Sequence, residues 1–199
     1  MIKVAILLFD DVEVLDFAAP FEVFSLAGTR IAPGTLEVTT VAARPQVSAR
    51  NGLGVSRHRS FGEAGRPEVV VLPGGPGVER VLSDDPESVA WIRDTVPKAS
   101  FALAICSGAL FLARGGWLAN RRASTHHSDI ELLKRMEPSV QITHGKRYVV
   151  DGSLITSDGI SAGLDASLYL VSRVLGTDVA TRTAEWMEYD SDAWRSNGQ

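Results

Sequence analysis

The single cysteine of this 199-residue chain stands where a side chain could act as a nucleophile. Cys106 follows Phe101–Ile105, an apolar run that predicts a buried strand, and precedes the apolar helical stretch Ala109–Ala113. A tight strand-to-helix turn, eased by Gly108, would lift the thiol off the sheet, with the Ser107 N–H in the same space. The start of the helix would then lower the thiol pKa. An inert buried thiol is the alternative, and the local pattern leaves both open.

Two further segments would meet Cys106 if the strands are parallel, because parallel strands of a wound sheet end at one rim. The Pro73-Gly74-Gly75 turn could offer backbone N–H groups to a developing negative charge, although glycines also simply punctuate loops. Asp16 could be a desolvated, protonated carboxyl that donates a hydrogen bond to the thiolate. It could equally be the N-cap of a helix.

Thr125-His126-His127 follows a short predicted strand, Arg122–Ser124. His126 or His127 could supply an acid or base to the site, and either could instead be a loop residue. The four histidines form no recognisable ligand motif, and one cysteine cannot build a thiolate-rich zinc site. The sequence therefore predicts no metal.

Strand-like and helix-like segments alternate along the chain, which predicts an α/β fold with a mostly parallel sheet covered by helices on both faces. Besides those named above, the predicted strands are Ile2–Phe9, Leu36–Ala42 and Glu68–Leu72, with hairpins over Gln46–Arg59, through Asn51-Gly52, and over Tyr148–Thr156, through Asp151-Gly152. The other predicted helices are Leu15–Ala27, with Pro20 near its start, Pro86–Val96, Ser161–Leu175 and Asp178–Glu188. Without a repeat or linker, residues 1–199 are expected to form a single domain.

The composition restricts the partners and the compartment. The net charge is −4 and no Lys/Arg cluster stands out, so no nucleic acid is expected as a partner. Acids at Asp10 and Asp11 break the first apolar run and no small-residue cleavage site follows, which favours a core strand over a signal peptide or membrane span. A cytoplasmic location is expected, since no export signal precedes the lone cysteine.

Five motifs in order resemble the DJ-1/PfpI superfamily: Leu15–Pro20, Val71–Gly75, Ala104–Ala109, Arg122–His127 and Thr156–Asp165. The resemblance implies a flavodoxin-like three-layer sandwich, usually a homodimer, with Cys106 as nucleophile and Asp16 hydrogen-bonded to it. It implies backbone donors at Gly75 and Ser107. The pocket-lining candidates are Gly74, His126, His127 and Gly159. A dimer contact is expected to involve apolar residues that one small domain does not cover entirely, namely Phe21, Phe24 and Trp186.

Within the superfamily, the chain resembles isocyanide (isonitrile) hydratases and the amidase-like sensor domain of AraC-type regulators. The Glu188-Tyr189-Asp190 segment is more similar to the hydratases, and a regulator would be expected to continue into a helix-turn-helix domain beyond Gln199. Ser107 stands where peptidase members carry His, and hydratases usually carry Thr there, so peptidase activity is not expected. The predicted function is hydration of an isocyanide to an N-substituted formamide through a Cys106 thioimidate, without a cofactor. A glyoxalase-like enzyme acting on α-oxoaldehydes and a non-catalytic small-molecule or redox sensor are the alternatives.

Overall fold

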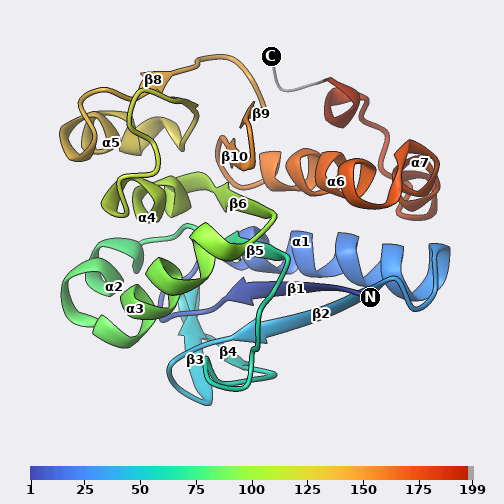
Figure 1. The fold of residues 1–199 in the computed structure, drawn as a ribbon, viewed down its shortest axis with the longest axis horizontal. Helices are drawn as coiled ribbons and strands as arrows, with labels where there is room; N and C mark the ends of the chain where they lie inside the picture. The colour runs from blue at the N-terminus through green and yellow to red at the C-terminus, as the bar shows by residue number, and fades with distance from the viewer. Residues whose placement is uncertain (197–199) are drawn as a thin grey trace.

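A six-stranded sheet forms the centre of the computed structural model, which describes residues 1–196 (Figure 1). Its order is β2-β1-β5-β6-β10-β9, and of these strands only the edge strand β9 runs antiparallel to its neighbour. The strands are β1 (Ile2–Leu7), β2 (Leu36–Val41), β5 (Val69–Leu72), β6 (Phe101–Ile105), β9 (Tyr148–Asp151) and β10 (Leu154–Ser157). The parallel strands therefore end at one rim, as the chemistry inferred from the sequence requires.

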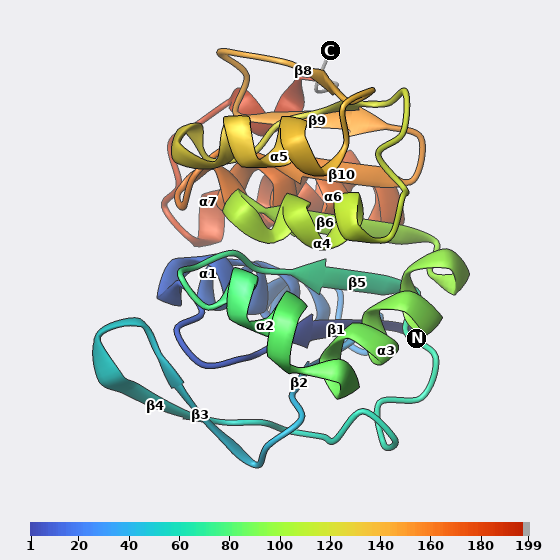
Figure 2. The same ribbon diagram turned by 90° about the vertical axis from the view of Figure 1, so that its left-hand side faces the viewer.

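Helices cover both faces of the sheet, which confirms the predicted three-layer sandwich. Figure 2 shows α2, α3, α4 and α5 in front of the sheet, with α1, α6 and α7 behind it. The helices are α1 (Val14–Leu26), α2 (Val78–Asp84), α3 (Pro86–Thr95), α4 (Ala109–Arg114), α5 (Ile130–Met136), α6 (Ala162–Leu175) and α7 (Thr177–Trp186). Across residues 1–196, none of these helices has the length and apolar character needed to cross a membrane.

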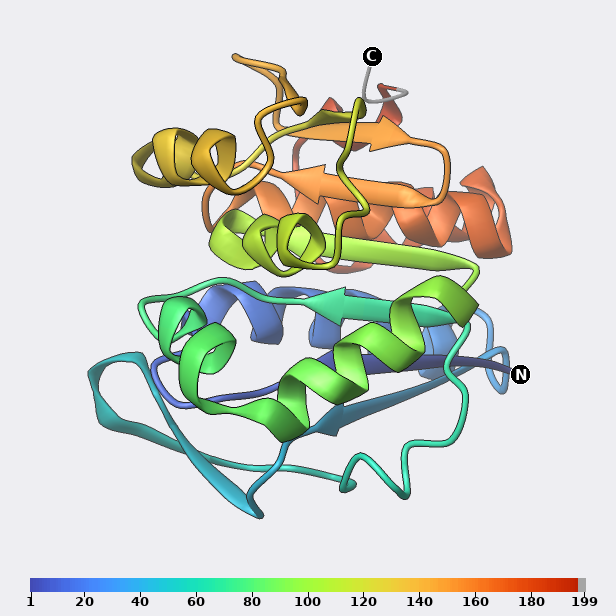
Figure 3. The ribbon, with the colours of Figure 1, turned by 60° about the vertical axis from the view of Figure 1, so that its left-hand side comes forward.

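A hairpin of β3 (Gln46–Ala49) and β4 (Leu53–Ser56) stands apart from the sheet (Figure 3). Its turn places Asn51 and Gly52 at positive φ, 62° and 83°, which confirms the hairpin predicted from this pair. The Arg50 N–H donates to the Val12 carbonyl (2.9 Å), in the loop that follows β1. This bond brings Arg50 to the rim where the parallel strands end.

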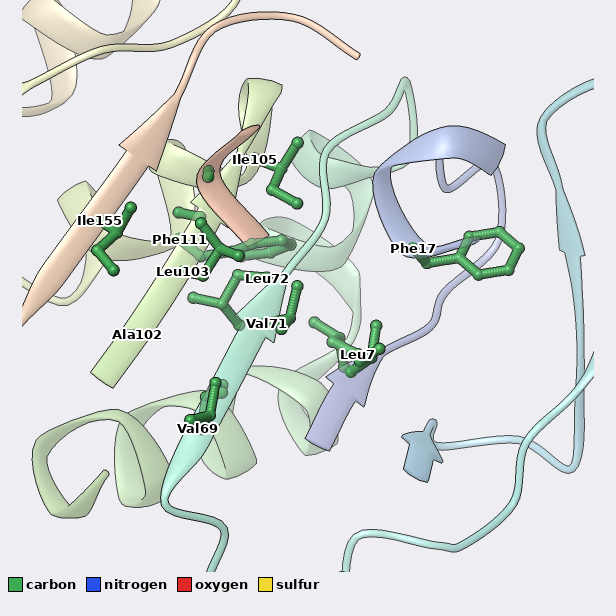
Figure 4. Packing of buried hydrophobic residues seen from close by; sticks show 14 of the residues in the cluster. Leu7, Phe17, Val69, Val71, Leu72, Ala102, Leu103, Ile105, Phe111 and Ile155 are labelled. Carbon is green, nitrogen blue, oxygen red and sulfur yellow. The ribbon is translucent and has the colours of Figure 1, made fainter. Parts of the chain in front are cut away.

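The core is densest around the two central strands. All four residues of β5 are fully buried, as expected for a β-branched run in a parallel sheet covered on both faces. Figure 4 shows Leu72, Leu103 and Phe111 packed between neighbouring elements. Val71 is in register with Leu103, and Leu72 with Ala104. This register places the turns that follow β5 and β6 side by side.

One local prediction was wrong, one was confirmed, and two short helices were missed. Helix α1 begins at Val14, so Pro20 is an interior residue and has no N–H to donate to the Asp16 carbonyl. The short strand predicted over Arg122–Ser124 is confirmed as β7 (Arg122–Ala123), one residue shorter, and it pairs in parallel with β8 (Gln141–Ile142) outside the main sheet. Helices α2 and α5, each seven residues long, were not predicted.

Candidate active site

Cys106 occupies a strained elbow between β6 and α4, as predicted. Its φ is +57°, a conformation that a residue with a side chain adopts only when its surroundings impose it. The Thr125 hydroxyl donates a hydrogen bond to the Cys106 carbonyl (2.9 Å) and helps to hold the turn. A Cβ atom at Gly108 would lie 2.0 Å from the Leu72 carbonyl oxygen. Only glycine therefore lets the elbow pass so close to β5.

Asp16 lies fully buried beside the elbow. Its Oδ2 accepts a hydrogen bond from the Gly74 N–H (3.0 Å), while Oδ1 has no partner at full hydrogen-bond geometry. Burial raises the pKa of Asp16 to about 7; the Gly74 N–H lowers that pKa, the charge of Glu13 raises it and the Cys106 side chain lowers it. Asp16 is the third residue of α1 and caps no helix, so the N-cap alternative is wrong.

The thiol is held in its protonated form by its surroundings. Burial and then the charge of Asp16 raise the pKa of Cys106 to about 12, while the N–H groups of Ser107 and Ile160, which hydrogen-bond the sulfur, lower it. The expected lowering of the thiol pKa by the helix start is therefore outweighed. Helix α4 is only six residues long, and a 3-10 turn over Cys106–Gly108 precedes it. Forming a thiolate thus requires the proton to move to a neighbouring group.

The two glycines after β5 have different roles from those predicted. A Cβ atom at Gly74 would lie 2.6 Å from the Ser107 nitrogen and 2.9 Å from the Cys106 Cβ, so the close approach depends on glycine. The Gly74 N–H is bonded to Asp16. The Gly75 N–H donates to the Ser107 Oγ (2.9 Å). Gly75 is therefore not a free donor toward a substrate, because the adjacent hydroxyl occupies its N–H.

Ile160 was missed in the sequence. It lies in the turn between β10 and α6, at the same rim as Cys106, with φ +49°. Positive φ is a genuine outlier for a β-branched residue, so its surroundings must impose it. A backbone N–H leaves no signal in residue type. The end of a parallel strand next to β6 was the one available clue.

Cys106 opens into a cavity of about 260 Å³. Arg50 reaches it from the β3–β4 hairpin and forms an ion pair with Glu13. The charged and titratable side chains on its wall are Glu13, Arg50, Glu79, Cys106, His126 and Asp129. A cavity of this size suits a small molecule, and its wall is polar around the thiol.

The two histidines are placed differently. His126 lines the Cys106 cavity, and its Nδ1 contacts the Ser128 Oγ (2.7 Å) and lies 3.8 Å from an Asp129 oxygen. The His127 ring lies against the His126 ring, with centroids 4.1 Å apart and planes tilted by 35°. His127 and Gly159 line a neighbouring cavity instead. Gly159 is required there, since a Cβ atom would lie 2.3 Å from the His126 ring.

A nitrogen of His126, a carboxylate oxygen of Asp129 and the Cys106 sulfur lie within 4.8 Å of one another. Among residues 1–196 this is the one group of three such side chains close enough to surround a metal ion. An ion held there would occupy the sulfur that nucleophilic chemistry needs. The group places a thiol beside an imidazole and a carboxylate, and two separate chain segments bring these side chains together.

Comparison with known proteins agrees with this geometry. The DJ-1/PfpI family model matches residues 2–173. Isonitrile hydratase of Pseudomonas putida is 29% identical over 189 residues, which cover 94% of this chain and 78% of that enzyme. The HTH-type transcriptional regulator GbdR of Pseudomonas aeruginosa is 26% identical over 145 residues, which cover 73% of this chain and 39% of the regulator.

Among solved structures, a ThiJ/PfpI family protein from Pseudomonas syringae superposes with a TM-score of 0.84 and 28% identity, covering 96% of this chain and 76% of that protein. The family model covers most of the chain, residues 2–173, and this match leads to one assignment. The chain belongs to the DJ-1/PfpI family.

Proposed function

We propose that this protein hydrates an isocyanide to an N-substituted formamide, with Cys106 as the nucleophile and Asp16 as the group that carries the proton. The observation that carries the proposal is the buried Asp16–Cys106 pair. With one pKa at about 7 and the other at about 12, the pair retains one proton through the neutral and mildly alkaline range. The 29% identity to isonitrile hydratase over nearly the whole chain supports this substrate class.

The first half-reaction forms a thioimidate. The proton of the pair first moves from Cys106 to Asp16, and the resulting thiolate, stabilised by the N–H groups of Ser107 and Ile160, attacks the terminal carbon of R–N≡C. A carbon–sulfur bond forms as Asp16 transfers its proton to the same carbon. The product is Cys106–S–CH=N–R, and Asp16 is left as a carboxylate.

The second half-reaction restores the pair. The Asp16 carboxylate takes a proton from water as the hydroxide adds to the thioimidate carbon, and then gives that proton to nitrogen. The carbon–sulfur bond breaks, the hydroxyl proton passes to Asp16, and R–NH–CHO leaves. One water is consumed for each isocyanide, and the pair again holds one proton.

This chemistry fits a site in which Ser107 follows the nucleophile. Peptide hydrolysis must protonate a poor amine leaving group, which needs an acid beside the scissile nitrogen. Isocyanide hydration releases no amine, so the proton that Asp16 and Cys106 share is sufficient. The Ser107 hydroxyl itself is engaged by the Gly75 N–H (2.9 Å) and takes no part in the proposed proton transfers.

The test is formamide formation from a small alkyl isocyanide by the purified protein. We expect turnover by the wild type, none by Cys106→Ala, and wild-type turnover by Asp178→Asn, which changes an exposed carboxylate on α7. A trapped thioimidate, seen as a mass added to the protein after acid quench, would place the covalent bond. Formamide formation by Cys106→Ala would overturn the role of the thiol.

A glyoxalase-like reaction is the second candidate, and the position of His126 favours it. A thiolate adds to the aldehyde carbon of an α-oxoaldehyde, a base moves the proton from that carbon to its neighbour, and water releases the 2-hydroxy acid. His126, whose ring nitrogen lies within 4.8 Å of the Cys106 sulfur, could move that proton. Loss of methylglyoxal that depends on both residues, without formamide formation, would select this candidate. Tight binding of a small molecule with no turnover would favour a sensor.

A further inference from the structure

An ion pair between the buried Asp165 and the half-exposed Arg147 lies beside the turn between β10 and α6, and the proposed chemistry does not use it. The side chain of Asp165, on α6, is fully buried and accepts a hydrogen bond from the Arg147 Nε (2.7 Å). Tyr189 donates its hydroxyl to the same carboxylate (3.1 Å), and so does Ser191 (3.0 Å). Asp165 is thus fixed by three donors. Such pairs are costly to desolvate, so their role is better sought in positioning than in stability.

The rest of the Arg147 guanidinium points to the turn between β10 and α6. Its Nη2 donates to the Ser161 carbonyl (2.7 Å) and its Nη1 to the Ser161 Oγ (3.1 Å). The Asp158 N–H in turn donates to the Arg147 carbonyl (3.0 Å). Arg147 therefore contacts the turn on both sides of Ile160, at Asp158 through its carbonyl and at Ser161 through its guanidinium. The planar fork of donors lets the guanidinium bind Asp165 and Ser161 together.

That turn is the strained one. Ile160, next to Ser161, has φ +49° and lines the Cys106 cavity, where its N–H meets the sulfur. We propose that Arg147 is a positioning residue, which ties Ser161 to Asp165 and so holds the Ile160 N–H against Cys106. Strain of this kind persists only where the surrounding contacts impose it, and Arg147 supplies those contacts.

The inference rests on the proposed function only in taking Cys106 as the reacting group. Its test measures the thiol itself and does not depend on the substrate. Cys106 is the only cysteine of the chain, so alkylation by iodoacetamide reports on this site alone. The charged groups that face the thiol remain unchanged in the variants below: Glu13, Asp16, Arg50, Glu79, His126 and Asp129.

We expect Arg147→Gln to raise the apparent thiol pKa by about one unit, and to slow alkylation at pH 8.5 about tenfold, because the thiolate loses one of its two N–H donors. Arg147→Lys should slow it similarly, since an ammonium keeps the charge but cannot span Asp165 and Ser161 together. Arg147→Gln/Asp165→Asn removes the uncompensated carboxylate, so a fold weakened by Arg147→Gln alone does not obscure the result.

Arg121→Gln is the matched control. Arg121 pairs with Asp151 at the other end of β9 (3.0 Å), and its side chain is 44% exposed against 42% for Arg147. We expect wild-type alkylation from this control at every pH. A pH profile that stays at wild type in Arg147→Gln/Asp165→Asn would overturn the proposal. Full rescue by Arg147→Lys would also overturn it, because charge rather than positioning would then be sufficient.

Discussion

Replacing Asp16 by Asn should speed one reaction of Cys106 and stop another. Burial and then the Asp16 charge raise the thiol pKa to about 12, and Asn keeps the size of Asp16 without its charge. Burial is the larger cause, so we assign the carboxylate about one pH unit of the rise, or about 1.4 kcal/mol. At pH 8.5 Asp16 is ionised, since its pKa is about 7. The thiolate fraction, and with it the alkylation rate, should therefore rise about tenfold in Asp16→Asn.

The rate of isocyanide hydration should fall in Asp16→Asn, because the variant lacks the group that carries the proton. A loss of about a hundredfold or more is expected for a general acid–base residue. Iodoacetamide alkylation followed by mass spectrometry and formamide formation, both at pH 8.5, measure the two effects on one preparation. Asp178→Asn should leave both unchanged. If alkylation slows or stays the same in Asp16→Asn, the carboxylate does not raise the thiol pKa, and the reasoning fails.

Three other predictions test the fold around the pair. Burial raises the pKa of Asp16 from 3.8 to about 7, so the folded state binds more protons than the unfolded state between these pH values. The free energy of unfolding of the wild type, measured by urea titration at pH 5 and pH 8, should therefore fall as pH rises through 7. In Asp16→Asn the same titrations should lack the part of this fall that comes from Asp16. Gly74→Ala should destabilise the fold by about 1–3 kcal/mol and abolish hydration, because the added Cβ would lie 2.6 Å from the Ser107 nitrogen. Gly62→Ala is the control, since a Cβ atom there meets open space. Thermal melts and the formamide assay compare the two variants. We also propose a homodimer through the 54% exposed Trp186, so light scattering should give a dimer for the wild type and a monomer for Trp186→Glu; a monomeric wild type would contradict it.

The sequence predicted the sheet well because its central strands have no polar face. Val69–Leu72 and Phe101–Ile105 are apolar runs, each followed by a turn that contains glycine, and parallel strands covered on both faces have this composition. Helices α2 and α5 were missed because seven residues make only two turns, too few for the helical period to stand out. Phe24, suggested as a dimer contact, is fully buried within its own chain.

The site was predictable only as far as side chains and strand ends reveal it. The placement of Asp16 beside Cys106 followed from the rule that parallel strands end together. The Ile160 N–H had no such signal, since any residue type offers the same group. The prediction that the Gly75 N–H is a donor for the substrate was wrong, because this N–H donates to the Ser107 hydroxyl, 32 residues away in the sequence. The effect of burial on the thiol pKa also depends on packing that no local pattern contains.

Residues that are far apart in the sequence form the site, and this determines when during folding the Cys106 sulfur becomes protected. The bond between Asp16 and Gly74 spans 58 residues, and the Ile160 turn follows β10, which pairs with the distant strand β6. Such distant pairings form late in folding. Until then Cys106 is an ordinary exposed thiol with a pKa near its usual value of about 8.5, more reactive at neutral pH than in the folded protein. Newly made chains should therefore be most vulnerable to alkylating and oxidising agents before assembly is complete, and the disappearance of thiol labelling during refolding would mark the last step of folding.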